Sequence, residues 1–138
     1  MTRGTRTRTA WLALATGLLL PGGSVLAHHS IAGMYDRSRQ AEIDGVITQF
    51  RFINPHPYIE LKDARTGQVW QIELDNRREF EAIGVTADTL KAGDRVVVTG
   101  SLGRRESNRM YARSLSRPAD GFGFEESGSR PRLMPRSR

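Results

Sequence analysis

The chain has only three histidines, and they fall at two places in the sequence. His28 and His29 follow Val25-Leu26-Ala27, and His56 stands between Pro55 and Pro57. Neutral imidazole is the most common metal ligand in proteins, and the chain has no cysteine that could supply a thiolate instead. The histidines are therefore the residues whose chemistry we consider first.

His28 gains a second nitrogen donor if export removes the residues before it. Positions 3, 6 and 8 are arginines, and residues 10–20 form an apolar run of 11 residues. Such a run is too short to span a bilayer, which needs about 20 residues. Val25 and Ala27 are small residues at the two positions that a signal peptidase recognises before its cut. The sequence thus predicts a secretory signal peptide at 1–27, cut after Ala27; an uncleaved amphipathic anchor is the alternative.

Cleavage at that point would expose a nitrogen-rich donor set. A terminal amine has a pKa of about 7.7 to 8.0, so a metal displaces its proton easily near neutral pH. The amine and imidazole of His28, with an imidazole from His56 or His29, favour Cu(II) over zinc or nickel. We therefore predict a metal site formed by His28, His29 and His56, with copper as its cofactor.

Two simpler explanations of these motifs stay open. The paired histidines could serve only as a flexible polar lead-in at the cleavage site. Asn54, Pro55, His56 and Pro57 could form only a rigid turn, since Asn-Pro commonly opens turns and a proline restricts the residue before it.

Charge and composition limit the classes of partner. The net charge is +6, but residues 28–116 hold 13 basic and 12 acidic residues, so the excess lies at the two ends. A nucleic-acid-binding domain concentrates basic charge on its folded face, which argues against that function. Without cysteine there are no disulfides and no lipidated cysteine. We expect a periplasmic or secreted domain with no stable membrane anchor after cleavage.

Alternating apolar residues predict strands over most of the middle of the chain. The segments are 42–53, 58–62, 69–74, 95–100 and 109–116, with Gly45 permitting a bend in the first and Gly67 closing a turn after the second. Between the third and fourth segments, Asn76 and Glu79 form a predicted capping box and Gly84 ends a short helix.

This order predicts a mainly β fold: a small five-stranded OB-like Greek-key barrel with one short helix between strands 3 and 4. We place the barrel at residues 42–117, with a lead-in segment at 28–41. Residues 118–138 are rich in Gly, Pro, Ser and Arg without apolar periodicity, so we expect a disordered C-terminal tail there. The competing architecture is an open antiparallel sheet with one helix on a face.

Several motifs carry a family resemblance. HHS at 28–30 is followed by GVITQFRFINPHPYIEL, LKAGDRVVVTG and SNRMYARSL. Together they resemble domain-of-unknown-function family 6152, a family of small exported bacterial proteins, over residues 27 to 120. The resemblance implies export and a small domain, and it brings no established activity.

A second function belongs to a different class. OB barrels commonly bind extended ligands across strands 2 and 3, with loops as rims. Here the rims are 54–58 and 103–109, which suggests an interaction module for a non-metal ligand or a periplasmic protein, although charged loops are often merely solvated. Its candidate residues are Asn54, Tyr58, Arg104, Arg105, Asn108 and Arg109. No nucleophile motif or phosphate-binding loop predicts an enzyme.

Geometry provides a test of the shared metal site. A first strand of about 10 residues puts His56 roughly 33 Å from the start of that strand. Residues 30–41 must then return along the barrel wall nearly extended, unless the first strand is strongly coiled. A helix at 30–35 is expected to prevent His28 from reaching His56.

Overall fold

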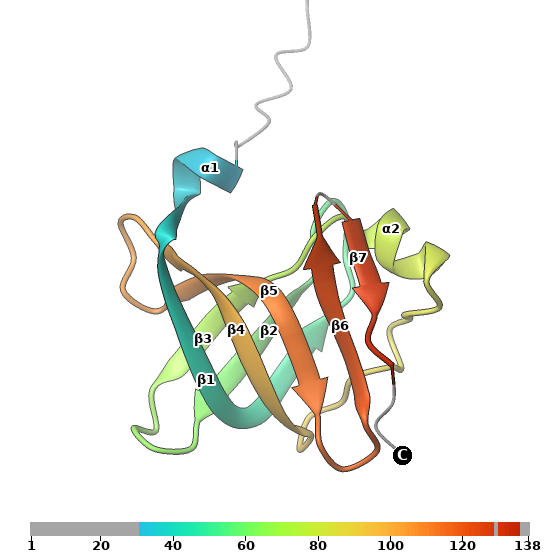
Figure 1. Ribbon diagram of the computed structural model, residues 1–138. Coiled ribbons are helices and arrows are strands. Elements are labelled where there is room, and N and C mark those ends of the chain that lie inside the picture. Colours follow the sequence, from blue (N-terminus) through green and yellow to red (C-terminus); the bar gives the residue numbers. More distant parts are fainter. Residues whose placement is uncertain (1–30, 129, 136–138) are drawn as a thin grey trace, which may run out of the picture.

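The strands of the barrel follow one another with short connections. The computed structural model describes residues 31–128 and 130–135. Helix α1 (Ile31–Met34) leads directly into the long strand β1 (Tyr35–Arg51) (Figure 1). The remaining elements are β2 (Tyr58–Asp63), β3 (Val69–Glu73), α2 (Arg77–Ala82), β4 (Arg95–Gly103), β5 (Arg109–Arg117), β6 (Phe122–Ser127) and β7 (Arg130–Leu133).

Five of these strands close into a ring. The sheet order is β3-β2-β1-β4-β5-β6-β7, and β3 also pairs in parallel with the start of β5. That parallel pairing joins the two ends of the five-stranded set, and all other neighbours are antiparallel. This is the strand order of an OB barrel, with α2 between β3 and β4. The predicted fold is confirmed, and the open-sheet alternative is wrong.

The ring closes because β1 bends sharply and pairs with a different strand on each side. Its first half lies along β4 and its second half along β2, and Gly45 faces both Val96 and Asp63 in the register. A Cβ at Gly45 would collide with the carbonyl oxygen of Lys62. Glycine therefore permits the close approach of β2 at the bend, as the sequence suggested.

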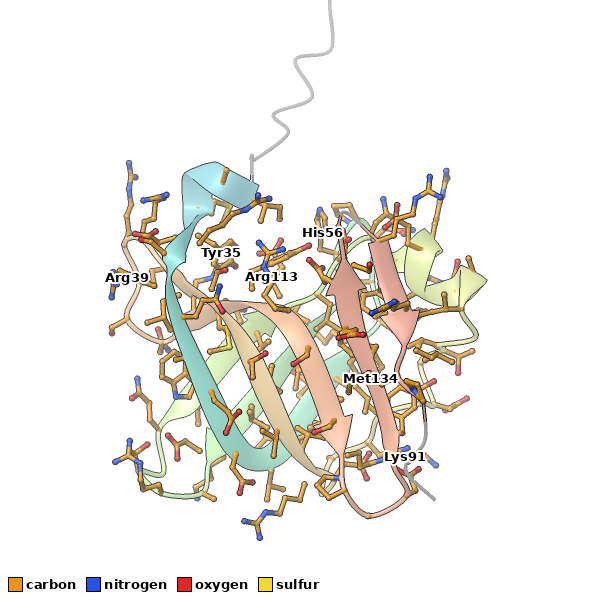
Figure 2. All side chains as sticks on the ribbon, viewed as in Figure 1. Tyr35, Arg39, His56, Lys91, Arg113 and Met134 are labelled. Atoms are coloured by element: carbon orange, nitrogen blue, oxygen red, sulfur yellow. The ribbon has the colours of Figure 1, made fainter. Side chains whose placement is uncertain are left out.

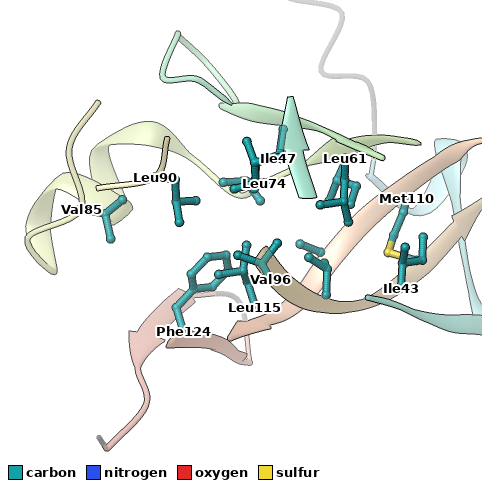
Figure 3. Close-up of a cluster of buried hydrophobic side chains, with 14 of the residues drawn as sticks. Ile43, Ile47, Leu61, Leu74, Val85, Leu90, Val96, Met110, Leu115 and Phe124 are labelled. Carbon is teal, nitrogen blue, oxygen red and sulfur yellow. The ribbon is translucent and has the colours of Figure 1, made fainter. Parts of the chain in front are cut away.

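The interior is filled by the apolar positions of the alternating segments (Figure 3). The alternating apolar side chains of β2 and β4 are all fully buried: Ile59, Leu61, Val96 and Val98. Phe80 from α2 closes one side of this core and packs edge-on against Phe124, with ring centroids 4.8 Å apart.

The N-terminal cap of α2 forms only in part as predicted. The Asn76 side chain accepts a hydrogen bond from the Arg78 N–H, and Gly84 has φ 86° after the helix. The expected reciprocal bond from Glu79 is absent: the Asn76 N–H donates to Asp75 Oδ1 at 2.7 Å, and Glu79 Oε2 is buried without a partner. The carboxylate of Asp75 thus accepts the hydrogen bond that the capping box assigns to Glu79.

The expected disordered tail at 118–138 is wrong for most of its length. β6 pairs with the second half of β5, and β7 pairs with β6. β3 pairs with β5 only at Arg109–Tyr111, so the rest of β5 would otherwise leave an open edge. Phe124 enters the barrel core with 1% exposure. One buried aromatic residue and a free strand edge order a segment that has no apolar periodicity.

The lead-in segment predicted at 28–41 is also longer than the structure shows. β1 begins at Tyr35, seven residues before the predicted start, and its first residues pair with the end of β4. Residues 37–39 have no register partner between the pairs Asp36–Leu102 and Gln40–Ser101. This bulge breaks the alternation by which the strand would have been identified. Among the described residues, no helix has the length and hydrophobicity to cross a membrane.

Candidate functional site around His56

His56 lies in the loop between β1 and β2, and backbone hydrogen bonds dock this loop onto the segment after β3. The Leu74 N–H donates to Pro57 O at 2.8 Å, and the Arg77 N–H donates to Pro55 O at 3.0 Å. The imidazole is half-buried, and its Nδ1 is a buried atom with no hydrogen-bond partner. A buried polar atom without a partner is costly, so this nitrogen suits a role in holding a ligand.

The start of β1 is tied to the same segment. The Tyr35 hydroxyl donates to Glu73 Oε2 at 2.6 Å, and Glu73 is the register partner of Tyr58. Figure 2 shows Tyr35 and His56 toward the same end of the barrel, where α1 also lies. The described chain therefore begins at the end of the barrel that carries His56.

This placement changes the expected geometry of the metal site. A helix does form, at Ile31–Met34, and we expected a helix here to prevent the reach. That expectation assumed a strand starting at residue 42, with His56 at the far end of its length. Instead β1 is 17 residues long and bends at Gly45, so both of its ends lie toward one end of the barrel. His28 and His29 lie outside the described residues.

Beside Tyr35 lies a second set of buried and half-buried polar side chains, on the outer face of β5 and on the strands next to it. The Tyr111 hydroxyl donates to Glu126 Oε1 at 2.8 Å, and Arg113 Nη1 lies 2.8 Å from Glu126 Oε2. Arg113 Nε donates to the fully buried Ser101 hydroxyl at 3.5 Å. The rings of Tyr35 and Tyr111 are 5.6 Å apart. We call Tyr35, Glu73, Tyr111, Arg113 and Glu126 the polar end.

Burial governs the electrostatics of the polar end. Desolvation, followed by the neighbouring carboxylate, raises the pKa of the Tyr35 and Tyr111 hydroxyls well above the ordinary value of tyrosine. Desolvation also raises the pKa of Glu126, and the nearby Asp75 charge adds to the rise. Both tyrosines thus remain hydrogen-bond donors at physiological pH, each to its own carboxylate.

The residues predicted on the 103–109 loop mainly make contacts within the chain. Arg104 Nε donates to Ala32 O at 3.1 Å, and the Asn108 side chain donates to Val69 O at 3.3 Å. Arg109 lies between Glu106, at 3.3 Å, and Glu73, at 3.8 Å, while its Nε is buried without a partner.

The other predicted ligand-binding residues are less engaged. Arg105 is exposed and forms no hydrogen bond or ion pair with the described chain. On the first loop, Tyr58 lies under the Arg51 guanidinium at 5.6 Å, and Asn54 is exposed. Both loops therefore contact β3 and its continuation.

Within residues 31–128 and 130–135, no three His, Asp or Glu side chains are arranged to hold a metal ion. His56 is the one histidine in that part of the chain. A shallow depression of about 450 Å³ lies at the opposite end of β2, where Asp44, Asp63 and Arg95 line it. Its charges are mixed and it is open to solvent.

Sequence reasoning missed the polar end entirely. Arg109, Tyr111 and Arg113 do alternate along β5, which indicates a common outer face, but outer faces normally point to solvent. Their burial depends on β6 and on the start of β1, and the sequence did not identify either segment as a strand. No local pattern could have identified Glu73 and Glu126 as their partners.

Comparison with known proteins yields a family without an established activity. No curated protein matches the chain. A chain of the S. pombe Stn1–Ten1 complex is 19% identical with a TM-score of 0.48, over 59% of this chain and 60% of that one. The ZRD-deleted mutant of TiaS, solved in complex with agmatine, is 18% identical with a TM-score of 0.46, over 73% of this chain and 27% of that one.

This chain spans less than two thirds of either structure, and we base the fold on its own strand pairing. The model of DUF6152, a family of unknown function, matches residues 17–111, which is most of the chain. The protein therefore belongs to the DUF6152 family.

Proposed function

We propose that this protein is an exported OB-like binding module that holds Cu(II) between its mature N-terminus and His56. The observation that supports this most is the pair of bonds at the end of β3. Glu73 accepts from Tyr35 at 2.6 Å, and the next residue, Leu74, donates to Pro57 at 2.8 Å. One short segment thus contacts both the start of β1 and the loop that carries His56.

The length of chain before α1 fits this site. Three residue steps separate His28 from Ile31, and such a segment reaches at most about 10 Å. Because Ile31 opens the helix that leads into Tyr35, this reach is measured from the end of the barrel at which β1 begins. The donors are the His28 amine and imidazole, with the His56 imidazole or that of His29 completing the set.

Nitrogen donors of this kind select copper. A tetragonal nitrogen-rich site and the general order of divalent-metal affinities both favour Cu(II). The half-buried position of His56 supports the same role, since its side chain is held by a docked loop rather than free in solvent.

Export is the part of the proposal on which the amine depends. It is supported by the basic start, the 11-residue apolar run and the small residues before His28. Mass spectrometry of the mature protein from a periplasmic fraction tests it. A polypeptide starting at His28 is the expected result, and any other start removes the terminal chelate.

The copper site is tested by titrating Cu(II) into three proteins. These are the processed protein starting at His28, the same protein with one extra residue before His28, and His56→Ala. Removing a ligand should weaken binding by more than the 10- to 100-fold typical of outer-shell partners. Asn54→Ala, an exposed change on the same loop, is the matched control and should bind as the unmodified protein does.

The outcomes separate the possible sites. Weaker binding in both the extended protein and His56→Ala supports the shared site. Weaker binding in the extended protein alone leaves a terminal chelate formed by His28 and His29. Equal binding in all three rejects the copper proposal.

An interaction module for a non-metal ligand or a periplasmic protein remains the second candidate. It has less support, because Arg104, Asn108 and Arg109 are already engaged with their own chain.

A further inference from the structure

The polar end contains two tyrosine–carboxylate pairs that look alike. Tyr35 donates to Glu73 at 2.6 Å, and Tyr111 donates to Glu126 at 2.8 Å. The two tyrosines are almost fully buried, with 1% and 4% exposure. Each carboxylate also lies near an arginine: Arg109 is 3.8 Å from Glu73 and Arg113 is 2.8 Å from Glu126.

The two pairs connect different parts of the molecule. Tyr111 and Glu126 lie on β5 and β6, which are already joined by a ladder of backbone hydrogen bonds. Their side-chain bond therefore adds little to the placement of either strand. Tyr35 and Glu73 lie on β1 and β3, which are not neighbours in the sheet.

The Tyr35 bond therefore joins two strands that do not pair directly with each other. On one side of it, Tyr35 directly follows Met34, the last residue of α1. On the other side, Glu73 pairs with Tyr58 and precedes Leu74, whose N–H holds the His56 loop through Pro57. The contact joins the segment that leads back to the N-terminus to the segment that holds the His56 loop.

We propose that Tyr35 and Glu73 are positioning residues, which hold the start of β1 at a fixed distance from the His56 loop. This inference rests on the proposed copper site, and neither residue contacts the metal in it. A metal that must order two separate segments loses affinity to the entropy of ordering them, and a preformed spacing removes that cost. The hydroxyl of Tyr35 provides that spacing through its bond to Glu73.

The chain offers a closely matched pair of variants. Tyr35→Phe and Tyr111→Phe each remove one hydroxyl, keep the ring and leave the carboxylate beside its arginine. Tyr35→Phe should lower the Cu(II) affinity of the processed protein by about tenfold, the lower end of the range for outer-shell changes. Tyr111→Phe should change it by less than about twofold, because it leaves the link between β1 and β3 intact.

Three measurements are needed on each protein: Cu(II) affinity by competition with a chelator, stability in urea, and hydrogen exchange without metal. In Tyr35→Phe, the amides of Leu74 and Arg77, which hold the His56 loop, should exchange faster than in Tyr111→Phe. A merely structural role would reduce the stability of both variants without separating their affinities.

Unchanged copper affinity in Tyr35→Phe overturns the positioning role and leaves the proposed copper site in place. Equal losses of affinity in the two variants overturn it as well, because the effect is then one of general stability. If the unmodified processed protein binds no Cu(II), the proposed function itself fails and the positioning role fails with it. The exchange rates then still show whether Tyr35 couples the two segments.

Discussion

The interior of the barrel is fully buried and its polar end is partly buried, and different forces hold them. In the interior, Phe80 and Phe124 meet edge-to-face at 4.8 Å among aliphatic side chains. At the polar end, Tyr111 and Arg113 both hold Glu126 through hydrogen bonds of 2.8 Å. Apolar contacts are non-directional and scale with area, whereas hydrogen bonds fix particular atoms in place. The interior thus accounts for stability, and the polar end accounts for geometry.

The largest effect in this comparison is expected in the interior. Phe124→Ala should lower the free energy of unfolding by about 3–5 kcal/mol, as for other fully buried phenylalanines. Its ring is almost entirely buried against Phe80, although it lies on a strand beyond the five-stranded ring. Urea unfolding monitored by circular dichroism measures the change.

Phe122→Ala is the control on the same strand. Phe122 is half-buried and lies beside Arg117 at the margin of the core, so its loss should cost less than half as much. A cost for Phe124→Ala no larger than that for Phe122→Ala would mean that β6 does not belong to the core.

The interior is also the part that the sequence predicted well. Alternation places Ile59 and Leu61, or Val96 and Val98, on one face of a strand, and burial of that face follows from the hydrophobic effect alone. The helix position between β3 and β4 and the glycine at the bend of β1 then indicated the barrel. Each of these signals is local, so one sequence was sufficient.

The polar end could not be predicted in the same way. Tyr35, Glu73 and Glu126 come from three strands, and the sequence around each one predicts an ordinary surface residue. They are shielded from solvent, fully or in part, because the ring closes through the pairing of β3 with β5 and because β6 covers the rest of β5. His56 was identified from its residue type, whereas its placement near the start of β1 depends on the bend and early start of that strand.

The second expected effect is a pH dependence confined to the polar end. Burial raises the pKa of Glu126 in the folded protein above the ordinary value of about 4.3 that it has when unfolded. The folded state then binds the proton more tightly than the unfolded state does. As the pH falls from neutral through the raised pKa, Glu126 should therefore increase the free energy of unfolding.

Glu126→Gln should remove this increase between neutral pH and about pH 4.3, which urea unfolding at a series of pH values measures. Glu125→Gln is the control, because Glu125 lies on the same strand and pairs with Arg132 in a more exposed position. Asp36, Asp44 and Asp63 have lowered pKa values, so the stability that they contribute is lost only at more acidic pH. Identical pH profiles for Glu126→Gln and the unmodified protein would contradict the burial of this carboxylate.

The smallest effect is expected where the polar end meets the N-terminal segment. The Arg104 backbone N–H donates to Met34 O at 2.9 Å, and its Nε donates to Ala32 O at 3.1 Å. Its Nη1 also lies 3.4 Å from Asp36. Because the guanidinium is about half exposed, its ion pair adds little to global stability, and Arg104→Ala should change the free energy of unfolding by less than about 1 kcal/mol.

The local effect of Arg104→Ala should be larger than the global one. A hydrogen bond of about 1 kcal/mol corresponds to roughly fivefold in a local opening equilibrium, so amides in residues 31–36 should exchange about fivefold faster. Arg105→Ala, an exposed change next to it, should leave that exchange unaltered. Tyr35 still anchors the start of β1 in Arg104→Ala, so exchange at Leu74 should not change. Faster exchange at Leu74 in this variant would instead show that α1 and the His56 loop are coupled through the 103–109 loop, and that Tyr35 is not the link between them.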